Sequence, residues 1–259
     1  MKSQTAPFVA LSRRVTQGGR QPISELMHRG LAQPEIVSLA AGFVDQASLP
    51  VDAFRQAAEA LFADPHRARA ALQYGTTPGL PRLRKQVLDR LLAADRRADA
   101  EDLSIDRVVI TGGSNQLLHL VTSCLCDEGD IVLVAAPTYF VYLGLLGSLG
   151  VRAVGVEADE DGLVADSLEA VLQQLQRSGE LPRVKMIYIV TYFDNPSSIT
   201  LSAIRRAQIV ELAQRFSLGG TAGHRIHILE DAAYRDLRYA GEDIPSLWSH
   251  DDGQHGDGQ

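Results

Sequence analysis

Glu230 and Asp231 are adjacent carboxylates that close the last apolar run of the sequence, and Tyr234 follows shortly after them. An ionised carboxylate beside buried apolar surface is destabilising by several kcal/mol unless a cation or hydrogen-bond donors meet it. Asp231 therefore needs a partner, which is either a structural arginine, with Arg235 and Arg238 nearby, or a bound ligand. Successive strand residues point to opposite faces, so Glu230 is expected to face the other way and to serve the structure.

The segment TGGSNQLLHL, residues 111–120, follows an earlier apolar run. Gly112 and Gly113 allow the backbone to approach an anion, and Ser114 offers a hydroxyl group. The helix expected after them would present free N–H groups and the positive end of its dipole. This arrangement predicts a phosphate site, although a Gly-Gly turn can equally be structural. The segment matches neither GxGxxG nor GxxxxGK[ST], so it specifies no dinucleotide or nucleoside triphosphate.

Two further side chains follow other apolar runs. Tyr139 lies in APTYF, where its ring either stacks on a flat ligand or packs in the core. Asn195 precedes Pro196, which favours an extended, turn-like backbone, so its amide either donates to a ligand or closes a turn. An anion site, a flat ring, an amide, a carboxylate and a phenol are together what pyridoxal phosphate (PLP) requires. No one of these sites is decisive, but the combination predicts a PLP site.

These residues need a sheet that brings the ends of the apolar runs together. Continuous apolar runs of this length are typical of strands covered on both faces, as in a parallel sheet. Strand alternating with helix predicts a doubly wound, mostly parallel α/β sheet, in which ligands bind outside the carboxyl ends of the strands. The expected strands are residues 108–111, 131–135, 151–156, 184–190 and 226–230.

Apolar residues recur at helical spacing in three segments, which predicts one apolar stripe on each helix. Asp166 or Ser167 is expected to cap the second of these helices, and Ser202 the third. Residues 52–62 and 80–93 are also expected to be helical. The three stripes are Leu117, Leu120, Val121 and Cys124; Leu168, Val171, Leu172 and Leu175; and Ile209, Leu212, Ala213 and Phe216.

The composition limits the class of protein. With 259 residues, 45% of them hydrophobic, the chain is long enough to bury a large core. A net charge of −7 with scattered basic residues disfavours nucleic acid as a partner. No window approaches the ~20 apolar residues of a membrane span, and no secretory signal opens the sequence, so a cytoplasmic protein is expected. Cys124 and Cys126 lack a second cysteine pair to complete a zinc site, and no metal site is predicted.

Five stretches of the sequence have the same order and spacing as the motifs of one known family. They are LQYGTTPGLPRLRKQV, VVITGGSNQLLHL, APTYFVYLGLL, YFDNPSSITLSAIRRAQIVELA and ILEDAAYRDLRYAGEDIPSL. From about residue 38 to 248 the sequence resembles the class I/II aminotransferases of the fold-type I PLP-dependent transferases. The resemblance implies the large PLP-binding domain of that fold. It also implies amino-group transfer between an amino acid and a 2-oxo acid, and a homodimer with shared sites.

The resemblance assigns roles to single residues. Gly113, Ser114 and Asn115 resemble the family's phosphate-binding loop. Tyr139 resembles the aromatic residue that stacks on the pyridine ring. Tyr74 is similar to the tyrosine that reaches the phosphate of the neighbouring subunit.

Further roles concern the ring substituents and the substrate. Asn195 resembles the amide on the ring oxygen O3′, and Tyr234 the phenol on the same oxygen. Asp231 resembles the carboxylate on the pyridinium nitrogen, where it would make the ring an electron sink. Gly42 resembles the glycine of a backbone contact to substrate, although AGFVDQASLP departs from the family's glycine-x-proline pattern. NPSS likewise stands where the family has N-P-T/H-G.

The family's catalysis depends on a lysine that forms a Schiff base and shuttles a proton. The three lysines of this sequence do not fit that role, because Lys2 is in the terminal segment, Lys85 on a polar helix face, and Lys185 at the entry end of a strand. We therefore interpret the chain as an N-terminal portion of a longer protein, whose sheet lacks later strands and leaves unpaired edges. The expected division is an N-terminal arm with part of a small domain at 1–50, an incomplete PLP-binding large domain at 51–248, and a polar, loop-like tail at 249–259.

Three functions stay open at this point. The first is a PLP-dependent aminotransferase, of which this chain alone would fold poorly and show no transaminase activity. The second is a non-catalytic PLP-binding pseudoenzyme or regulatory subunit. The third is a Rossmann-like nucleotide-binding domain. The amino acid donor is not specified by the sequence.

Overall fold

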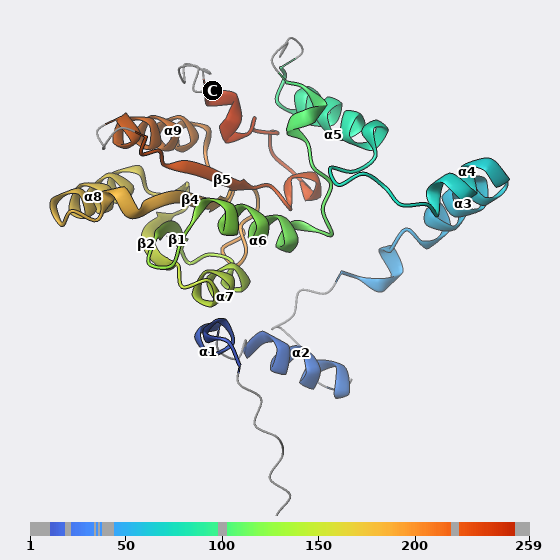
Figure 1. The fold of residues 1–259 in the computed structure, drawn as a ribbon, viewed down its shortest axis with the longest axis horizontal. Coiled ribbons are helices and arrows are strands. Elements are labelled where there is room, and N and C mark those ends of the chain that lie inside the picture. The colour runs from blue at the N-terminus through green and yellow to red at the C-terminus, as the bar shows by residue number, and fades with distance from the viewer. Residues whose placement is uncertain are drawn as a thin grey trace, which may run out of the picture.

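The computed structural model is an α/β structure with one five-stranded sheet (Figure 1). The structure describes residues 11–18, 22–33, 35, 37, 44–97, 103–218 and 223–251. The strand order is β3-β2-β1-β4-β5, and all neighbours run parallel except β2 and β3. The strands are β1 (Ile131–Ala136), β2 (Arg152–Asp159), β3 (Gly162–Leu163), β4 (Val184–Val190) and β5 (His227–Asp231).

Nine α-helices are present in the described residues, and four of them pack around the sheet. These four are α6 (Ser114–Leu125), α7 (Phe140–Ser148), α8 (Ala165–Arg177) and α9 (Ala203–Leu218). The others are α1 (Arg13–Gly18), α2 (Pro22–Ala32), α3 (Val51–Phe62), α4 (Pro65–Ala71) and α5 (Pro81–Ala94). Short 3-10 helices lie at Gln46–Ser48, Ile105–Arg107, Leu181–Arg183, Arg235–Leu237 and Leu247–His250.

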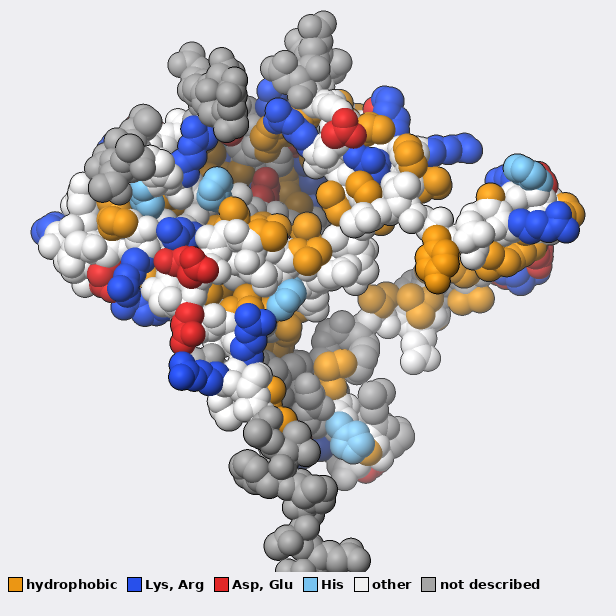
Figure 2. Space-filling model, in the orientation of Figure 1, with side chains coloured by type: hydrophobic (Ala, Val, Ile, Leu, Met, Phe, Trp, Pro, Cys, Tyr) orange, Lys and Arg blue, Asp and Glu red, His pale blue; other side chains and the backbone are white. Residues whose placement is uncertain are grey.

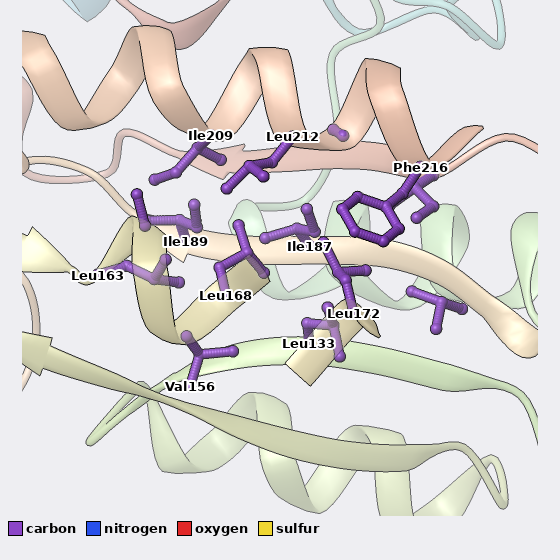
Figure 3. Close-up of a cluster of buried hydrophobic side chains, with 14 of the residues drawn as sticks. Leu133, Val156, Leu163, Leu168, Leu172, Ile187, Ile189, Ile209, Leu212 and Phe216 are labelled. Carbon is purple, nitrogen blue, oxygen red and sulfur yellow. The ribbon is translucent and has the colours of Figure 1, made fainter. Parts of the chain in front are cut away.

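Alternate residues of the central strands enter two different cores, because successive side chains of a strand point to opposite faces. On one face, Leu133 and Ile187 pack with the apolar stripes of α8 and α9 (Figure 3). On the other face, Val134 and Tyr188 pack with residues of α6 and α7. The sheet is therefore buried on both sides, as the continuous apolar runs predict.

The stripes predicted for α8 and α9 are confirmed. Their members are buried or pack against the core, and Leu168, Leu172 and Ile209 are fully buried. Ser202 caps α9 as predicted, since its Oγ accepts the N–H of Arg205 at 3.5 Å. The cap predicted for α8 is wrong, because Val164 occupies the N-cap position.

The stripe predicted for α6 is wrong except at Val121, which packs against the core. Leu118 and Thr122 are the buried residues of this helix, whereas Leu117, Leu120 and Cys124 are exposed. Helix α6 has two apolar faces, and the spacing of its apolar residues does not predict which face packs against the sheet. The hydroxyl of Thr122 is satisfied on the buried side by the carbonyl of Leu118, at 2.7 Å.

The predicted strand at 108–111 is also wrong, because this segment is extended but belongs to no sheet. Its backbone groups bond elsewhere: the N–H of Ile110 to the carbonyl of Pro78 at 2.9 Å, and the carbonyl of Val108 to Nε of Arg84 at 2.7 Å. In the described part of the chain β5 has a neighbouring strand on one side only.

Two of the helices before the sheet were expected from the sequence. Helices α1 and α2 lie within residues 1–50, the expected N-terminal arm, and α1 lies against α7. The helices expected at 52–62 and 80–93 are present as α3 and α5. The pair α3–α4 stands apart from the sheet (Figure 1). No described helix is long and apolar enough to cross a membrane. The domain boundaries stay a prediction, and residues 252–259 of the expected tail lie outside the described residues.

Candidate active site

The candidate site lies at the carboxyl-terminal edge of the parallel strands. Tyr139 follows β1 and directly precedes α7, Asn195 follows β4, and Asp231 is the last residue of β5. Tyr234 follows in the next turn. Tyr139 and Tyr234 both pack against the buried cluster on the α6–α7 face. The fold therefore brings these side chains to one edge, as predicted from the order of the runs.

Among the described residues, Asp231 is held by hydrogen-bond donors and by no cation. The phenol of Tyr188 donates to its Oδ2 at 3.0 Å, and the N–H of Ala233 donates to its Oδ1 at 3.1 Å. Arg235 bonds instead to Asp95 and Asp243, and Arg238 bonds to the carbonyl of Gly241. The alternative in which an arginine of this loop neutralises Asp231 is thus excluded by the geometry.

Glu230 has the opposite environment on the other face of β5. Its Oε1 accepts from Arg206 Nη1 at 3.1 Å and from the Thr191 hydroxyl at 2.8 Å, and its Oε2 accepts the N–H of Leu247 at 2.9 Å. Burial raises the pKa of Glu230, and the Thr191 hydroxyl and the Arg206 guanidinium act against that rise. The structural role expected for Glu230 is confirmed.

Two pairs of polar side chains lie at the carboxyl-terminal side of the sheet. The amide Nδ2 of Asn195 lies 3.4 Å from the phenol oxygen of Tyr234, and the Asn195–Pro196 bond is cis. The phenol of Tyr139 lies 3.5 Å from Oδ1 of Asn115. Both contacts are long for hydrogen bonds. These four groups therefore retain hydrogen-bonding capacity for a ligand.

The start of α6 supplies free backbone donors. Gly113 is its N-cap, with φ +93°, and no side chain caps the helix there. A residue with a Cβ is strained at this φ, so the turn requires glycine. Ser114 and Asn115 begin the helix, and the N–H groups of a first helical turn have no intrahelical partner. Such an end binds anions through these N–H groups and the helix dipole.

Several residues singled out in the sequence are not brought to this edge. Tyr74 is 99% exposed beyond α4. Lys85 pairs with Asp89 on the surface of α5, and Lys185 lies at the opposite end of β4, 4.0 Å from Asp130. Gly42 and Lys2 lie outside the described residues.

Tyr188 is the site residue that sequence reasoning missed. It lies inside the apolar run VKMIYIV, so only its hydroxyl distinguishes it from a core residue. Its side chain is fully buried. Burial, followed by the negative charge of Asp231, raises the pKa of Tyr188 far above its ordinary value, so the phenol stays protonated and donates.

Comparison with known proteins agrees with this geometry. The family model described as aminotransferase class I and II matches residues 34–255. The chain belongs to this family. The match disfavours the Rossmann-like nucleotide-binding alternative.

Individual relatives are aminotransferases of several specificities. The chain is 32% identical to aromatic-amino-acid aminotransferase 1 of Thermococcus litoralis, over 84% of this chain and 48% of the relative. It is 29% identical to 2-aminoadipate transaminase of Thermus thermophilus, over 83% and 48% of the two chains. The crystal structure of Pyrococcus horikoshii kynurenine aminotransferase in complex with PMP superposes with a TM-score of 0.80 and 28% identity, covering 93% of this chain and 55% of that one. The chain thus spans about half the length of the aminotransferases it matches.

Proposed function

We propose that this chain binds pyridoxal phosphate at the carboxyl edge of its sheet, in the service of amino-group transfer from an amino acid to a 2-oxo acid. The observation that carries the proposal is Asp231, a carboxylate at the strand end that has two donors and, in the part of the chain that the structure describes, no arginine partner. A protonated pyridine nitrogen is the cation that such a carboxylate fits. Membership in the aminotransferase family supports the same reaction class.

The residues present fit the parts of the cofactor. The free N–H groups of Ser114 and Asn115, after the glycine turn at Gly113, would hold the phosphate. The ring of Tyr139 would stack on the pyridine ring, since Tyr139 lies at the same edge of the sheet. Gly113 has open space where a Cβ would stand, which leaves room for close approach of an anion.

The remaining groups would orient the ring and hold its protons. The amide of Asn195 and the phenol of Tyr234 would share O3′, and the long 3.4 Å contact between them leaves both free to do so. Asp231 would keep the proton on the ring nitrogen. When bound, PLP supplies a ring that takes up the electrons released as substrate Cα loses its proton.

Amino transfer also needs a lysine amine at the reacting carbon. Lys85 and Lys185 lie away from the site, and Lys2 is outside the described residues. We therefore expect purified chain 1–259 to give no detectable turnover of an amino acid with 2-oxoglutarate in a coupled assay. Detectable turnover would refute this expectation. The same absence keeps the regulatory, PLP-binding alternative as the second candidate.

A homodimer belongs to this proposal. The α3–α4 pair exposes large apolar side chains, including Phe54 at 78% and Leu72 at 76% (Figure 2). Exposed apolar surface of this kind is typical of a protein interface, and a second copy would cover it while placing Tyr74 near a site. The substrate contact at Gly42 and the cytoplasmic location stay predictions of the sequence, which does not specify the amino acid donor.

The Asp231→Asn variant tests the cofactor site. Pyridoxamine 5′-phosphate needs no lysine for binding, so calorimetry with this ligand measures the site of chain 1–259 directly. We expect the wild-type chain to bind it and Asp231→Asn to weaken binding about 10- to 100-fold, because a hydrogen bond to a charged group contributes about 1.5–3 kcal/mol.

Asp236→Asn is the matched control, since Asp236 is in the same loop but is 70% exposed and pairs with Arg90 on the surface. This variant should bind as the wild type does. Equal affinities of the wild type and Asp231→Asn would reject the assignment of Asp231 to the ring nitrogen.

A further inference from the structure

Tyr188 is a buried core residue that contacts Asp231 directly. It pairs with Leu229 in the register of β4 and β5, and Asp231 lies two residues further along on the same face. Its hydroxyl donates to Oδ2 of Asp231 at 3.0 Å.

Both carboxylate oxygens of Asp231 are fixed from different directions. Oδ2 accepts the phenol of Tyr188, which comes from the neighbouring strand, and Oδ1 accepts the N–H of Ala233 from the turn that follows. Two donors on two oxygens prevent the carboxylate from rotating. Each oxygen of an ionised carboxylate can accept a further hydrogen bond, so this holding leaves capacity for a ligand.

Tyr188 is itself fixed by the core behind it. Its ring lies against that of Tyr142, with centroids 4.2 Å apart. The Tyr142 hydroxyl is 2.9 Å from Oγ1 of Thr122, which also bonds to the carbonyl of Leu118. The ring of Tyr188 is therefore held by this ring contact, which does not depend on the Tyr142 hydroxyl.

We infer that Tyr188 is a positioning residue, which aims the carboxylate of Asp231 at the ring nitrogen of the bound cofactor. The inference rests on the proposed function and adds a residue to it. Tyr188 acts through Asp231 and need not touch the ligand. Groups that orient a ligating side chain from behind typically change affinity 10- to 100-fold when removed from metal sites, and the same reasoning applies to a carboxylate that binds a cation.

The test compares two ligands on two variants. The ligands are pyridoxamine 5′-phosphate and its 1-deaza analogue, in which C–H replaces the ring nitrogen. Tyr188→Phe keeps the ring and removes the phenol, and we expect it to weaken binding of pyridoxamine 5′-phosphate about tenfold. Its affinity for the 1-deaza analogue should equal that of the wild type, because that ligand offers Asp231 no N–H.

Tyr142→Phe is the matched control. It removes a buried phenol from the same cluster, but that phenol contacts Thr122 and not Asp231. Both affinities should be unchanged in this variant. Urea unfolding of each variant shows whether the chain is folded under the conditions of the titration.

The outcomes separate the inference from the proposed function. A wild-type chain that binds neither ligand overturns both. Wild-type binding with equal loss of both ligands in Tyr188→Phe, or with no loss of either, overturns the positioning role and leaves the cofactor site standing. A Tyr188→Phe chain that is unfolded also overturns it, since the phenol would then be needed for folding.

Discussion

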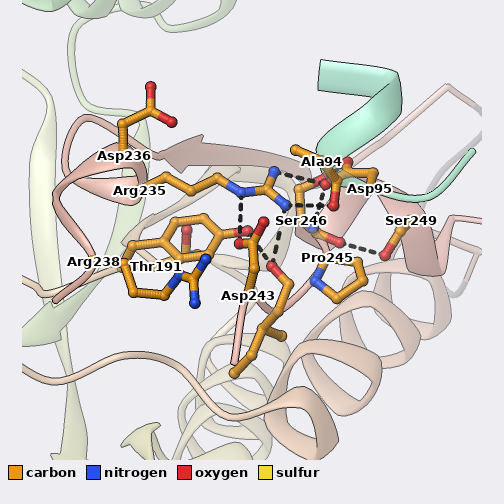
Figure 4. Close-up of polar contacts among 12 residues, drawn as sticks. Ala94, Asp95, Thr191, Arg235, Asp236, Arg238, Asp243, Pro245, Ser246 and Ser249 are labelled. Atoms are coloured by element: carbon orange, nitrogen blue, oxygen red, sulfur yellow. Dashed lines mark hydrogen bonds and ion pairs between the residues drawn. The ribbon is translucent and has the colours of Figure 1, made fainter. Parts of the chain in front are cut away.

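Replacing Asp95 with alanine is expected to lower the free energy of unfolding by about 3–5 kcal/mol, because it removes a buried carboxylate from the guanidinium of Arg235 and leaves two buried donors of Ser246 unpaired. The side chain of Asp95 is fully buried at the end of α5, 2.6 Å from Nη1 of Arg235 (Figure 4). Its two oxygens also accept the N–H and the hydroxyl of Ser246. Arg235 is only 10% exposed and donates further to Asp243.

Urea unfolding followed by circular dichroism measures this change. Asp89→Ala is the control on the same helix, since Asp89 forms an exposed pair with Lys85 and such pairs contribute about 0–1 kcal/mol. Because Arg235 follows Tyr234 directly, loss of Asp95 should also loosen the turn that carries this phenol. Equal stabilities of the two variants would show that the buried contact is not formed in solution.

Replacing Arg206 with methionine is expected to have an effect of similar size, about 3–5 kcal/mol, since it leaves Glu230 buried without a cation. Arg206 lies near the start of α9, and its side chain is fully buried. It donates to the carbonyls of Leu201 and Thr191, at 3.0 and 2.9 Å, and its guanidinium lies 4.4 Å from the ring centre of Tyr192. Methionine keeps much of the volume while removing every donor.

A double-mutant cycle with Glu230→Gln separates the charge from the packing. Each single variant leaves one member of the pair unmatched, whereas Arg206→Met with Glu230→Gln removes both charges. The double variant should therefore be more stable than the sum of the single losses predicts, as measured by urea unfolding. Strict additivity would contradict a direct interaction between the two side chains.

The fold was predictable from sequence where burial covers both faces of an element. Continuous apolar runs identified β1, β2, β4 and β5, and helical spacing identified the buried faces of α8 and α9. The same reasoning failed where the cover depends on distant segments. Segment 108–111 has the composition of a strand but no neighbouring strand in the described chain, and α6 has two apolar faces of which only one meets the sheet.

The candidate site was predictable in its order but not in its contacts. Positions after the strands placed Tyr139, Asn195 and Asp231 at one edge, because parallel strands end on the same side. What holds Asp231 was not visible, since Tyr188 is 43 residues away in the sequence. The partner of Arg235 is 140 residues away. Contacts over such separations depend on register and packing, which local patterns do not specify.

The pairing of β5 with β4 makes the register of β5 critical. Ile228 lies opposite Ile187 and Asp231 opposite Val190. A slip of one residue would exchange the two carboxylates, so that Glu230 would face the phenol and Asp231 the buried guanidinium. A one-residue deletion within the strand would thus interchange the structural acid and the ligand-facing acid, although both acids would still be in the sequence. Length variation among natural sequences should accordingly be confined to the turn that enters β5, upstream of the paired residues.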